Sequence, residues 1–104
     1  MLSEGKTAGS IIDLKEAIEL TANFRSENPN GIKAHLIDAS LVRKVLDQEG
    51  CINLRIYNGY DKIEQKICPI IIGVNKYDED MTEGIILDHM YKCPPNGAGS
   101  VLQE

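Results

Sequence analysis

Apolar side chains recur at helical spacing near the start of the chain. The expected buried stripe consists of residues three or four positions apart, namely Leu14, Ala17, Ile18, Thr21 and Phe24. Asp13 and Glu16 have the spacing of a capping box, which predicts that the helix begins at Asp13. Pro29 disfavours helix at the residue before it and Gly31 tolerates a positive φ, so the stretch NPNG ends the helix.

Two later stretches alternate between apolar and polar positions, which is the pattern of a half-buried strand. They are IKAHLID at residues 32–38 and CINLRIY at residues 51–57. A shorter helix, capped by Asp38 or Ser40, is predicted between them, and Gly50 follows it. The inner face of this helix is expected to hold Leu41, Val42, Val45 and Leu46.

The run KICPIIIGV, residues 66–74, is apolar at both alternating sets of positions. That pattern is typical of a strand covered on both faces. Pro69 favours an edge strand or a bulge, because proline cannot donate to a ladder. Both interpretations stay open on the sequence. A longer loop is predicted over residues 58–65, a polar turn over residues 75–80 and a short further strand over residues 84–88.

This order of elements predicts a two-layer α+β domain, in which two helices pack on one face of a three- or four-stranded mixed sheet. The chain has 104 residues, a common size for one domain. We therefore expect a flexible N-terminus over residues 1–10, a single α+β domain over residues 11–93 and a C-terminal tail over residues 94–104.

Charge and cysteine content narrow the class of protein. The net charge is −5, from 11 basic and 16 acidic residues, and the basic residues are scattered. Nucleic acid is therefore not an expected partner, because phosphate binding needs a basic face. No segment approaches membrane-spanning length, so no membrane partner is expected. Three cysteines do not resemble a disulfide framework, and we expect a cytoplasmic protein with reduced thiols.

The stretch HMYKCPPNG raises the question of a metal or thiol site. His89 and Cys93 would share one face of a helix, but a closed zinc site needs four ligands and no CxxC or HxxH pair is present. Counted from Asp78, an EF-hand loop lacks its glycine and its final glutamate. Phosphate-binding and hydrolase motifs are absent as well. An enzyme is disfavoured, and no catalytic, cofactor-binding or metal-binding residue is predicted.

The sheet face opposite the helices is the remaining candidate surface. Its expected side chains mix aliphatic, aromatic and basic types, as interface cores do, and they are Lys33, His35, Ile37, Asn53, Arg55, Tyr57, Ile67 and Ile71. In the alternative interpretation, GIILDHMY folds back over this face and makes it a second core layer.

Two functional hypotheses follow. The first is a small non-enzymatic protein-interaction module that acts through the outer sheet face, either by self-association as a homodimer or by docking another protein. Its candidate surface is His35, Arg55, Tyr57, Ile71, His89 and Cys93. The alternative is a small-molecule, thiol or metal-binding site around His35, Tyr57, His89 and Cys93.

Short motifs also carry a resemblance. GCINLRIYNG at residues 50–59, the later IIIGV and CPP at residues 93–95 resemble a group of small uncharacterised proteins of Bacteroidetes-type bacteria. The likeness covers about residues 13–95 and implies no activity. Members of that group often carry a further cysteine just after CPP. Asn96 and Gly97 stand there in this chain, which argues against a shared CPPxC-type redox or metal role.

Overall fold

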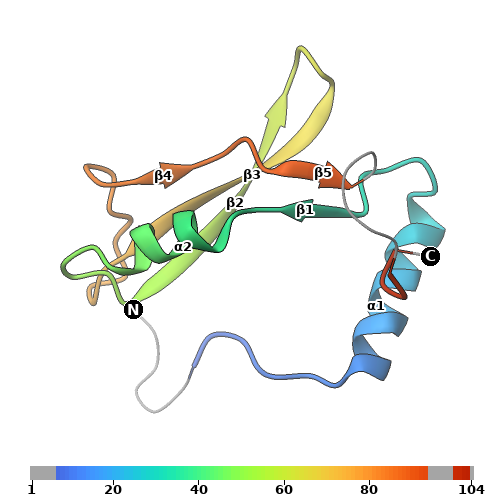
Figure 1. The fold of residues 1–104 in the computed structure, drawn as a ribbon, viewed down its shortest axis with the longest axis horizontal. Coiled ribbons are helices and arrows are strands. Elements are labelled where there is room, and N and C mark those ends of the chain that lie inside the picture. Colours follow the sequence, from blue (N-terminus) through green and yellow to red (C-terminus); the bar gives the residue numbers. More distant parts are fainter. Residues whose placement is uncertain (1–6, 94–99, 104) are drawn as a thin grey trace. The chain divides into compact units, whose positions relative to one another are not determined.

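The protein is an α+β fold of two helices and two antiparallel sheets, seen in a computed structural model that describes residues 7–93 and 100–103 (Figure 1). The elements in chain order are α1 (Leu14–Glu27), β1 (Ala34–Leu36), α2 (Ala39–Leu46), β2 (Asn53–Asp61), β3 (Lys66–Val74), β4 (Ile86–Leu87) and β5 (Tyr91–Cys93). The predicted α+β class is confirmed. No helix among these residues is long and apolar enough to cross a membrane.

Contacts group the described residues into two compact units. The hairpin unit comprises residues 37–90 and contains α2 with the sheet β2-β3-β4. The terminal unit comprises residues 7–36, 91–93 and 100–103, and contains α1 with the sheet β1-β5. The division into residues 1–10, 11–93 and 94–104 stays a prediction, and residues 1–6, 94–99 and 104 lie outside the described residues.

The predicted single mixed sheet is wrong, because β1 takes its partner from the far end of the chain. Ala34 lies opposite Cys93, and Leu36 lies opposite Tyr91, in an antiparallel pair. The Lys33 N–H extends this ladder by donating to the Cys93 carbonyl at 2.8 Å. Three-residue strands are too short to show alternation, so the local pattern could not reveal this distant pairing.

Helix α1 begins as predicted but does not bury the predicted stripe. The Glu16 N–H donates to Asp13 Oδ1 at 2.8 Å, which is the backbone half of the capping box. No residue of α1 is buried, and Leu14 and Phe24 are exposed. At the other end, Arg25 Nη1 donates to the Leu102 carbonyl at 2.6 Å, so α1 holds part of the C-terminal segment within the terminal unit.

The hairpin unit is built on the pairing of β2 with β3. The ladder runs without interruption from Asn53 opposite Val74 to Asp61 opposite Lys66. The loop is therefore residues 62–65, and the prediction of a loop over 58–65 is wrong at 58–61. Gly59 makes this continuation possible, since a Cβ there would lie 2.7 Å from the carbonyl oxygen of Cys68.

The position of Pro69 is explained by the ladder on the other side of β3. Pro69 lies opposite Asn58 of β2. On its second edge, β3 pairs with β4 only at Ile71 and Ile72 among the described residues. Pro69 precedes that short ladder and interrupts no bond in it, as expected for a proline beside a free edge.

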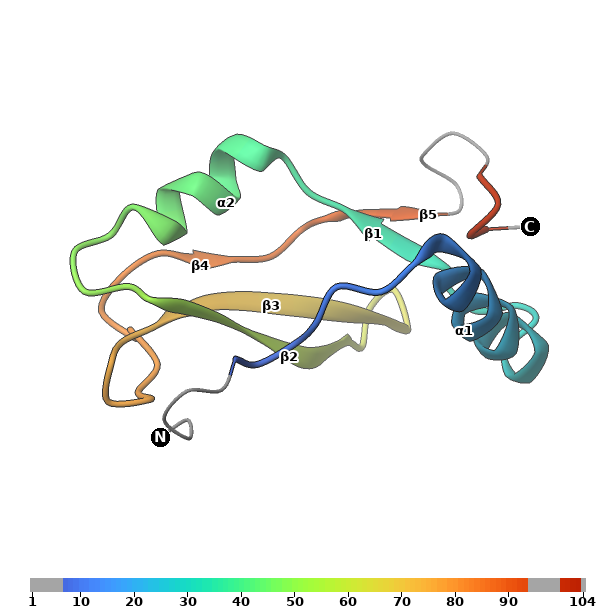
Figure 2. The ribbon, with the colours of Figure 1, turned by 90° about the horizontal axis from the view of Figure 1, so that it is seen from below.

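Helix α2 covers one face of the three-stranded sheet (Figure 2). Its Val45 is fully buried in a cluster with Ile71, Leu87 and Met90. Ile37 and Leu54 pack against this cluster. Ile71 is thus a core residue on the α2 side, and its predicted place on the outer face is wrong; Ile37 is misplaced in the same way. A run that is apolar at every position does not indicate which set faces the helix, and only the register with β2 decides it.

The segment GIILD joins the sheet at its edge instead of folding over the outer face. Leu87 lies opposite Ile71, and Ile86 lies opposite Ile72. Gln48, just after α2, holds the start of this segment: its Oε1 accepts the Ile85 N–H at 2.8 Å, and its Nε2 donates to the Val45 carbonyl at 2.9 Å. The interpretation of GIILDHMY as a second core layer is therefore wrong for β4.

Replacing Ile71 by alanine should destabilise the hairpin unit far more than the same change at Ile67. Both isoleucines lie on β3 and share a face, but Ile71 is 8% exposed and Ile67 is 50% exposed. We expect Ile71→Ala to lower the free energy of unfolding by about 2–5 kcal/mol, and Ile67→Ala by less than about 1 kcal/mol, in urea titrations followed by circular dichroism. Equal losses would contradict this orientation of β3, and Ile71→Val serves where the alanine variant does not fold.

Candidate functional site

On the face of the sheet opposite α2, four polar side chains form one hydrogen-bonded group, which we call the Arg55 cluster. Arg55 and Tyr57 come from β2, and Asp78 and Asp80 come from the loop after β3. Arg55 Nη2 donates to Asp78 Oδ1 at 2.7 Å, and Nη1 donates to Asp80 Oδ1 at 2.5 Å. The Tyr57 hydroxyl donates to the other oxygen of Asp80, Oδ2. One guanidinium therefore binds two carboxylates, and one of those carboxylates also binds a phenol.

The loop presents its two aspartates through a fixed local structure. Asn75 Oδ1 accepts the N–H groups of Tyr77 and Glu79, at 2.9 and 3.1 Å. Asp78 has φ 63, a left-handed conformation that aspartate tolerates better than most residues. Asp80 then returns to the sheet in a β-bridge with Val74. These turns direct Asp78 and Asp80 back toward β2.

Hydrogen bonds and charges shift the ionisation of the Arg55 cluster. The hydrogen bond from Tyr57, together with the hydrogen bond and charge of Arg55, lowers the pKa of Asp80 below its ordinary value. The same hydrogen bond to Asp80 is the main reason that the pKa of Tyr57 is raised. At neutral pH the carboxylate is charged and the phenol is a proton donor. With one arginine against two aspartates, the cluster carries a net charge of −1.

Arg55 and Tyr57 lie on the predicted face, but their partners come from their own chain. Arg55 lies directly opposite Ile72, and both residues are on the opposite face from Leu54 and Ile71. Asp78 and Asp80 could not be assigned to the site from sequence, because residues 75–80 have the pattern of a polar turn. Their spacing could not have indicated this, because Asp78 lies in a bend at φ 63 and not in an extended segment.

The residues of the predicted thiol or metal site belong to different units. His35 and Cys93 are in the terminal unit, whereas Tyr57 and His89 are in the hairpin unit. Within the β1-β5 sheet, His35 lies opposite Lys92 and Cys93 lies opposite Ala34, so the two side chains are on opposite faces. His89 has φ 60 and precedes a strand, so the predicted helical pairing with Cys93 is wrong.

Among residues 7–93 and 100–103, no group of three or more histidine, cysteine or acidic side chains could hold a metal ion. Cys51, Cys68 and Cys93 are free thiols. The Nε2 atom of His35 is buried and has no hydrogen-bond partner among the described residues.

The loop half of the β2-β3 hairpin carries a second feature, an exposed apolar strip. Tyr60 lies opposite Ile67, and Ile56 lies opposite Ile71, so Ile56, Tyr60 and Ile67 share the α2 side of the sheet. They are 63%, 60% and 50% exposed. Figure 1 shows this end of the hairpin (yellow) projecting beyond α2. We call these three residues the hairpin strip.

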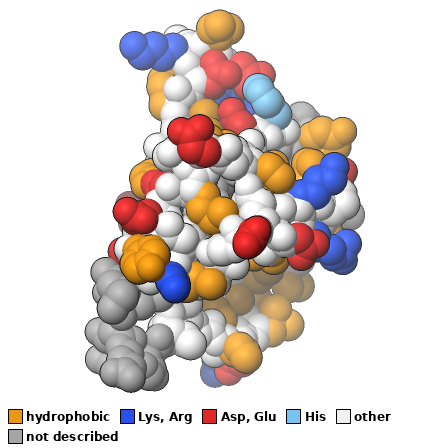
Figure 3. Space-filling view, turned by 90° about the vertical axis from the view of Figure 1, so that its left-hand side faces the viewer, with side chains coloured by type: hydrophobic (Ala, Val, Ile, Leu, Met, Phe, Trp, Pro, Cys, Tyr) orange, Lys and Arg blue, Asp and Glu red, His pale blue; other side chains and the backbone are white. Residues whose placement is uncertain are grey.

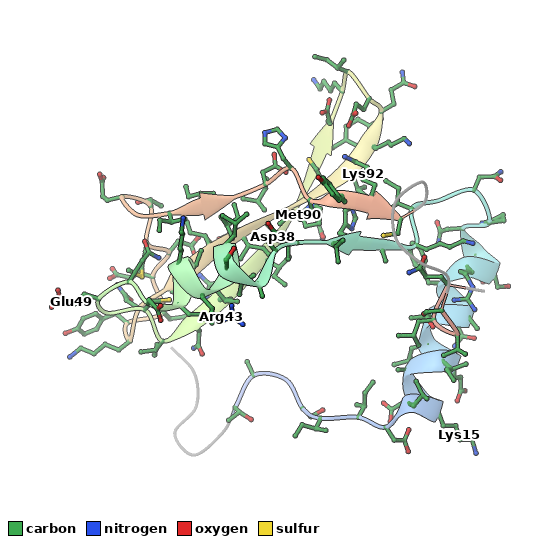
Figure 4. The ribbon with its side chains drawn as sticks, viewed as in Figure 1. Lys15, Asp38, Arg43, Glu49, Met90 and Lys92 are labelled. Atoms are coloured by element: carbon green, nitrogen blue, oxygen red, sulfur yellow. The ribbon has the colours of Figure 1, made fainter. Side chains whose placement is uncertain are left out.

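Elsewhere the surface of the hairpin unit mixes charged and apolar side chains, and Leu46, Ile52 and Ile86 are among the exposed apolar ones. Figure 4 shows Asp38 at the start of α2, Arg43 along it and Glu49 in the loop that follows. Figure 3 views the side on which the loops after α2 and β3 lie, and acidic side chains are dispersed there among hydrophobic ones. In the hairpin strip, Tyr60 and Ile67 lie directly opposite each other across two paired strands, and the pair Asn58 and Pro69 lies between them and Ile56 on the same face.

In comparisons with known proteins, no family model matches the chain, and no curated protein or solved structure matches it significantly. The resemblance to small bacterial proteins stays a prediction.

Removing the Tyr57 hydroxyl should raise the pKa of Asp80. The hydrogen bond from Tyr57 is the largest cause that lowers this pKa, so Tyr57→Phe should raise it toward the ordinary value of an aspartate. Carboxyl titration by NMR measures the change. Tyr60→Phe is the matched control, since it removes a hydroxyl from the same strand and should leave Asp80 unchanged. Equal titration curves in all three proteins would contradict the hydrogen bond.

Acid should remove the contribution of Asp80 to stability. Because the pKa of Asp80 is lower in the folded than in the unfolded state, the charged carboxylate stabilises the fold at neutral pH. That contribution is lost as the pH falls through the folded-state pKa. Asp80→Asn should therefore be less stable than the parent chain at pH 7, and the difference should shrink toward zero in acid, as thermal unfolding across pH would show. A difference independent of pH would assign the effect to something other than ionisation.

Proposed function

We propose that the chain is a small, non-enzymatic protein-interaction module, and that its contact surface is the loop half of the β2-β3 hairpin. The observation that carries this proposal is the hairpin strip of Ile56, Tyr60 and Ile67, with half or more of each side chain exposed. Tyr57, 45% exposed on the opposite face of β2, extends the surface to both sides of the hairpin.

The composition of this surface suits a protein partner. Aliphatic and tyrosine side chains are typical of the centre of an interface, where burial of apolar area contributes roughly 25 cal/mol per Å². Lys62, Glu64 and Lys66 lie around the turn and supply a charged rim. Single exposed apolar residues are ordinary, but Tyr60 and Ile67 lie directly opposite each other across two paired strands, and Ile56 is on the same face.

This surface is shifted from the outer sheet face that the sequence favoured. Ile71 contributes to the core, and Arg55 is bound to Asp78 and Asp80. Tyr57 remains part of the proposed surface. The thiol or metal alternative has less support, because His35 and Cys93 lie on opposite faces of their sheet. Three free thiols support the proposal that the protein acts in the cytoplasm.

A photo-reactive benzoylphenylalanine at position 60 should capture the partner in cells that naturally encode the chain. Tyr77 is the matched control position, since it is an exposed tyrosine in the loop after β3. We expect one defined adduct from position 60, its loss when Ile56→Asp is added, and no such adduct from position 77. The mass of the adduct identifies the partner as a second copy or a different protein. Absence of an adduct at position 60, or equal adducts at both positions, would contradict the proposed surface.

A further inference from the structure

The free edge of β2 is the feature from which the partner can be inferred. In the sheet order β2-β3-β4, β2 is an outer strand of nine residues. Among the described residues it pairs with β3 alone. In an antiparallel pair, alternate residues direct their N–H and C=O groups away from the partner strand. These groups form a row that can bind another strand.

The free edges of β2 and of β3 differ in their protection. The unpaired edge of β3, before the short ladder with β4, carries Lys66 and Pro69, both of which discourage strand addition. Along β2 there is neither lysine nor proline. The Arg55 side chain is paired with Asp78 and Asp80, so its charge does not oppose the approach of another strand to this edge. One edge is blocked, and the other is left able to pair.

We propose that β2 pairs with β2 of a second copy of this chain, antiparallel and centred on Asn58, so that two sheets join into one. This deepens the proposed function, on which it rests, by naming the partner. The twofold axis is perpendicular to the sheet, so directly opposite residues share a face. Ile56 then lies opposite Tyr60 of the second copy, and Tyr57 lies opposite its Gly59.

The register follows from the side chains of β2. Centring on Asn58 places Ile56 beside an aromatic ring on the strip side, and Arg55 opposite Asp61 of the second copy on the other side. Centring one residue earlier sets Ile56 against Asn58. Centring one residue later sets Ile56 against Lys62. Since Arg55 already binds two carboxylates, its pairing with Asp61 adds little stability and serves mainly to favour this register.

Lysine substitutions distinguish a dimer formed by pairing of the β2 edges from a dimer formed by contact between two hairpin strips. Ile56 and Ile67 are both isoleucines on the same face, but Ile56 lies on the edge strand and Ile67 on the inner one. In sedimentation equilibrium of the full chain, Ile56→Lys should raise the dimer Kd by at least about tenfold, because each dimer loses two cross-strand pairs. Ile67→Lys should change the Kd by less than about threefold. Equal weakening by both would assign the dimer to stacked strips and overturn the edge pairing.

Disulfide trapping tests the register. Two copies of residue 58 would lie opposite each other, with Cα atoms about 4.5–5.5 Å apart, within the range that a disulfide spans. Two copies of residue 53 would be about 34 Å apart along the strands. Mild oxidation should therefore give a covalent dimer from Asn58→Cys but not from Asn53→Cys, which carries the same native thiols. Equal dimer from both, or from neither, would overturn the register.

If the chain stays monomeric into the millimolar range, the pairing with a second copy is overturned. This holds whether residues of the same chain cover the edge of β2 or the edge is open to solvent. That failure is distinct from failure of the proposed function. A monomeric chain that still gave an adduct with a different protein at position 60 would retain the interaction surface and lose only the partner assigned here.

Discussion

The register between β2 and β3 is the constraint on which the hairpin unit depends. Every residue from Asn53 to Asp61 has a fixed partner on β3, and this pairing decides which isoleucines face α2. Moving β3 by one residue would turn Ile71 away from Val45 and bring Ile70 and Ile72 inward. The core, the Arg55 cluster and the hairpin strip are three consequences of one alignment.

The ladder is longer than the layer that covers it, and this difference shapes the surface. Helix α2 has eight residues and covers the end of the sheet at which Ile71 and Leu87 pack with its Val45. The hairpin continues past the helix, so side chains of the same face change from buried to exposed along a single strand. On the other face, the loop after β3 returns to bind Arg55 and Tyr57. Toward the turn end of the hairpin, Ile56, Tyr60 and Ile67 are therefore left half or more exposed.

The sequence predicted elements better than it predicted their partners. The capping residue Asp13, the strand over 66–74 and the outward direction of Arg55 and Tyr57 follow from local patterns, and the structure confirms them. The side that Ile71 faces depends on register, and the partner of β1 lies more than fifty residues away along the chain. Asp78 reaches Arg55 only because a turn with a positive φ redirects the loop. Such properties arise from tertiary pairing, which no spacing of apolar residues encodes.

The pairing of β1 with β5 has a consequence for the order in which the chain acquires its structure. Residues 37–90 hold all strands of one sheet within a continuous segment, so that sheet can form from neighbouring parts of the chain. β1 is synthesised before that segment, yet its partner β5 is synthesised after it. Closing so long a loop costs entropy and slows the search for contacts. On the ribosome, the first strand to emerge is therefore among the last to be hydrogen-bonded, and its backbone stays open to chaperones throughout the interval.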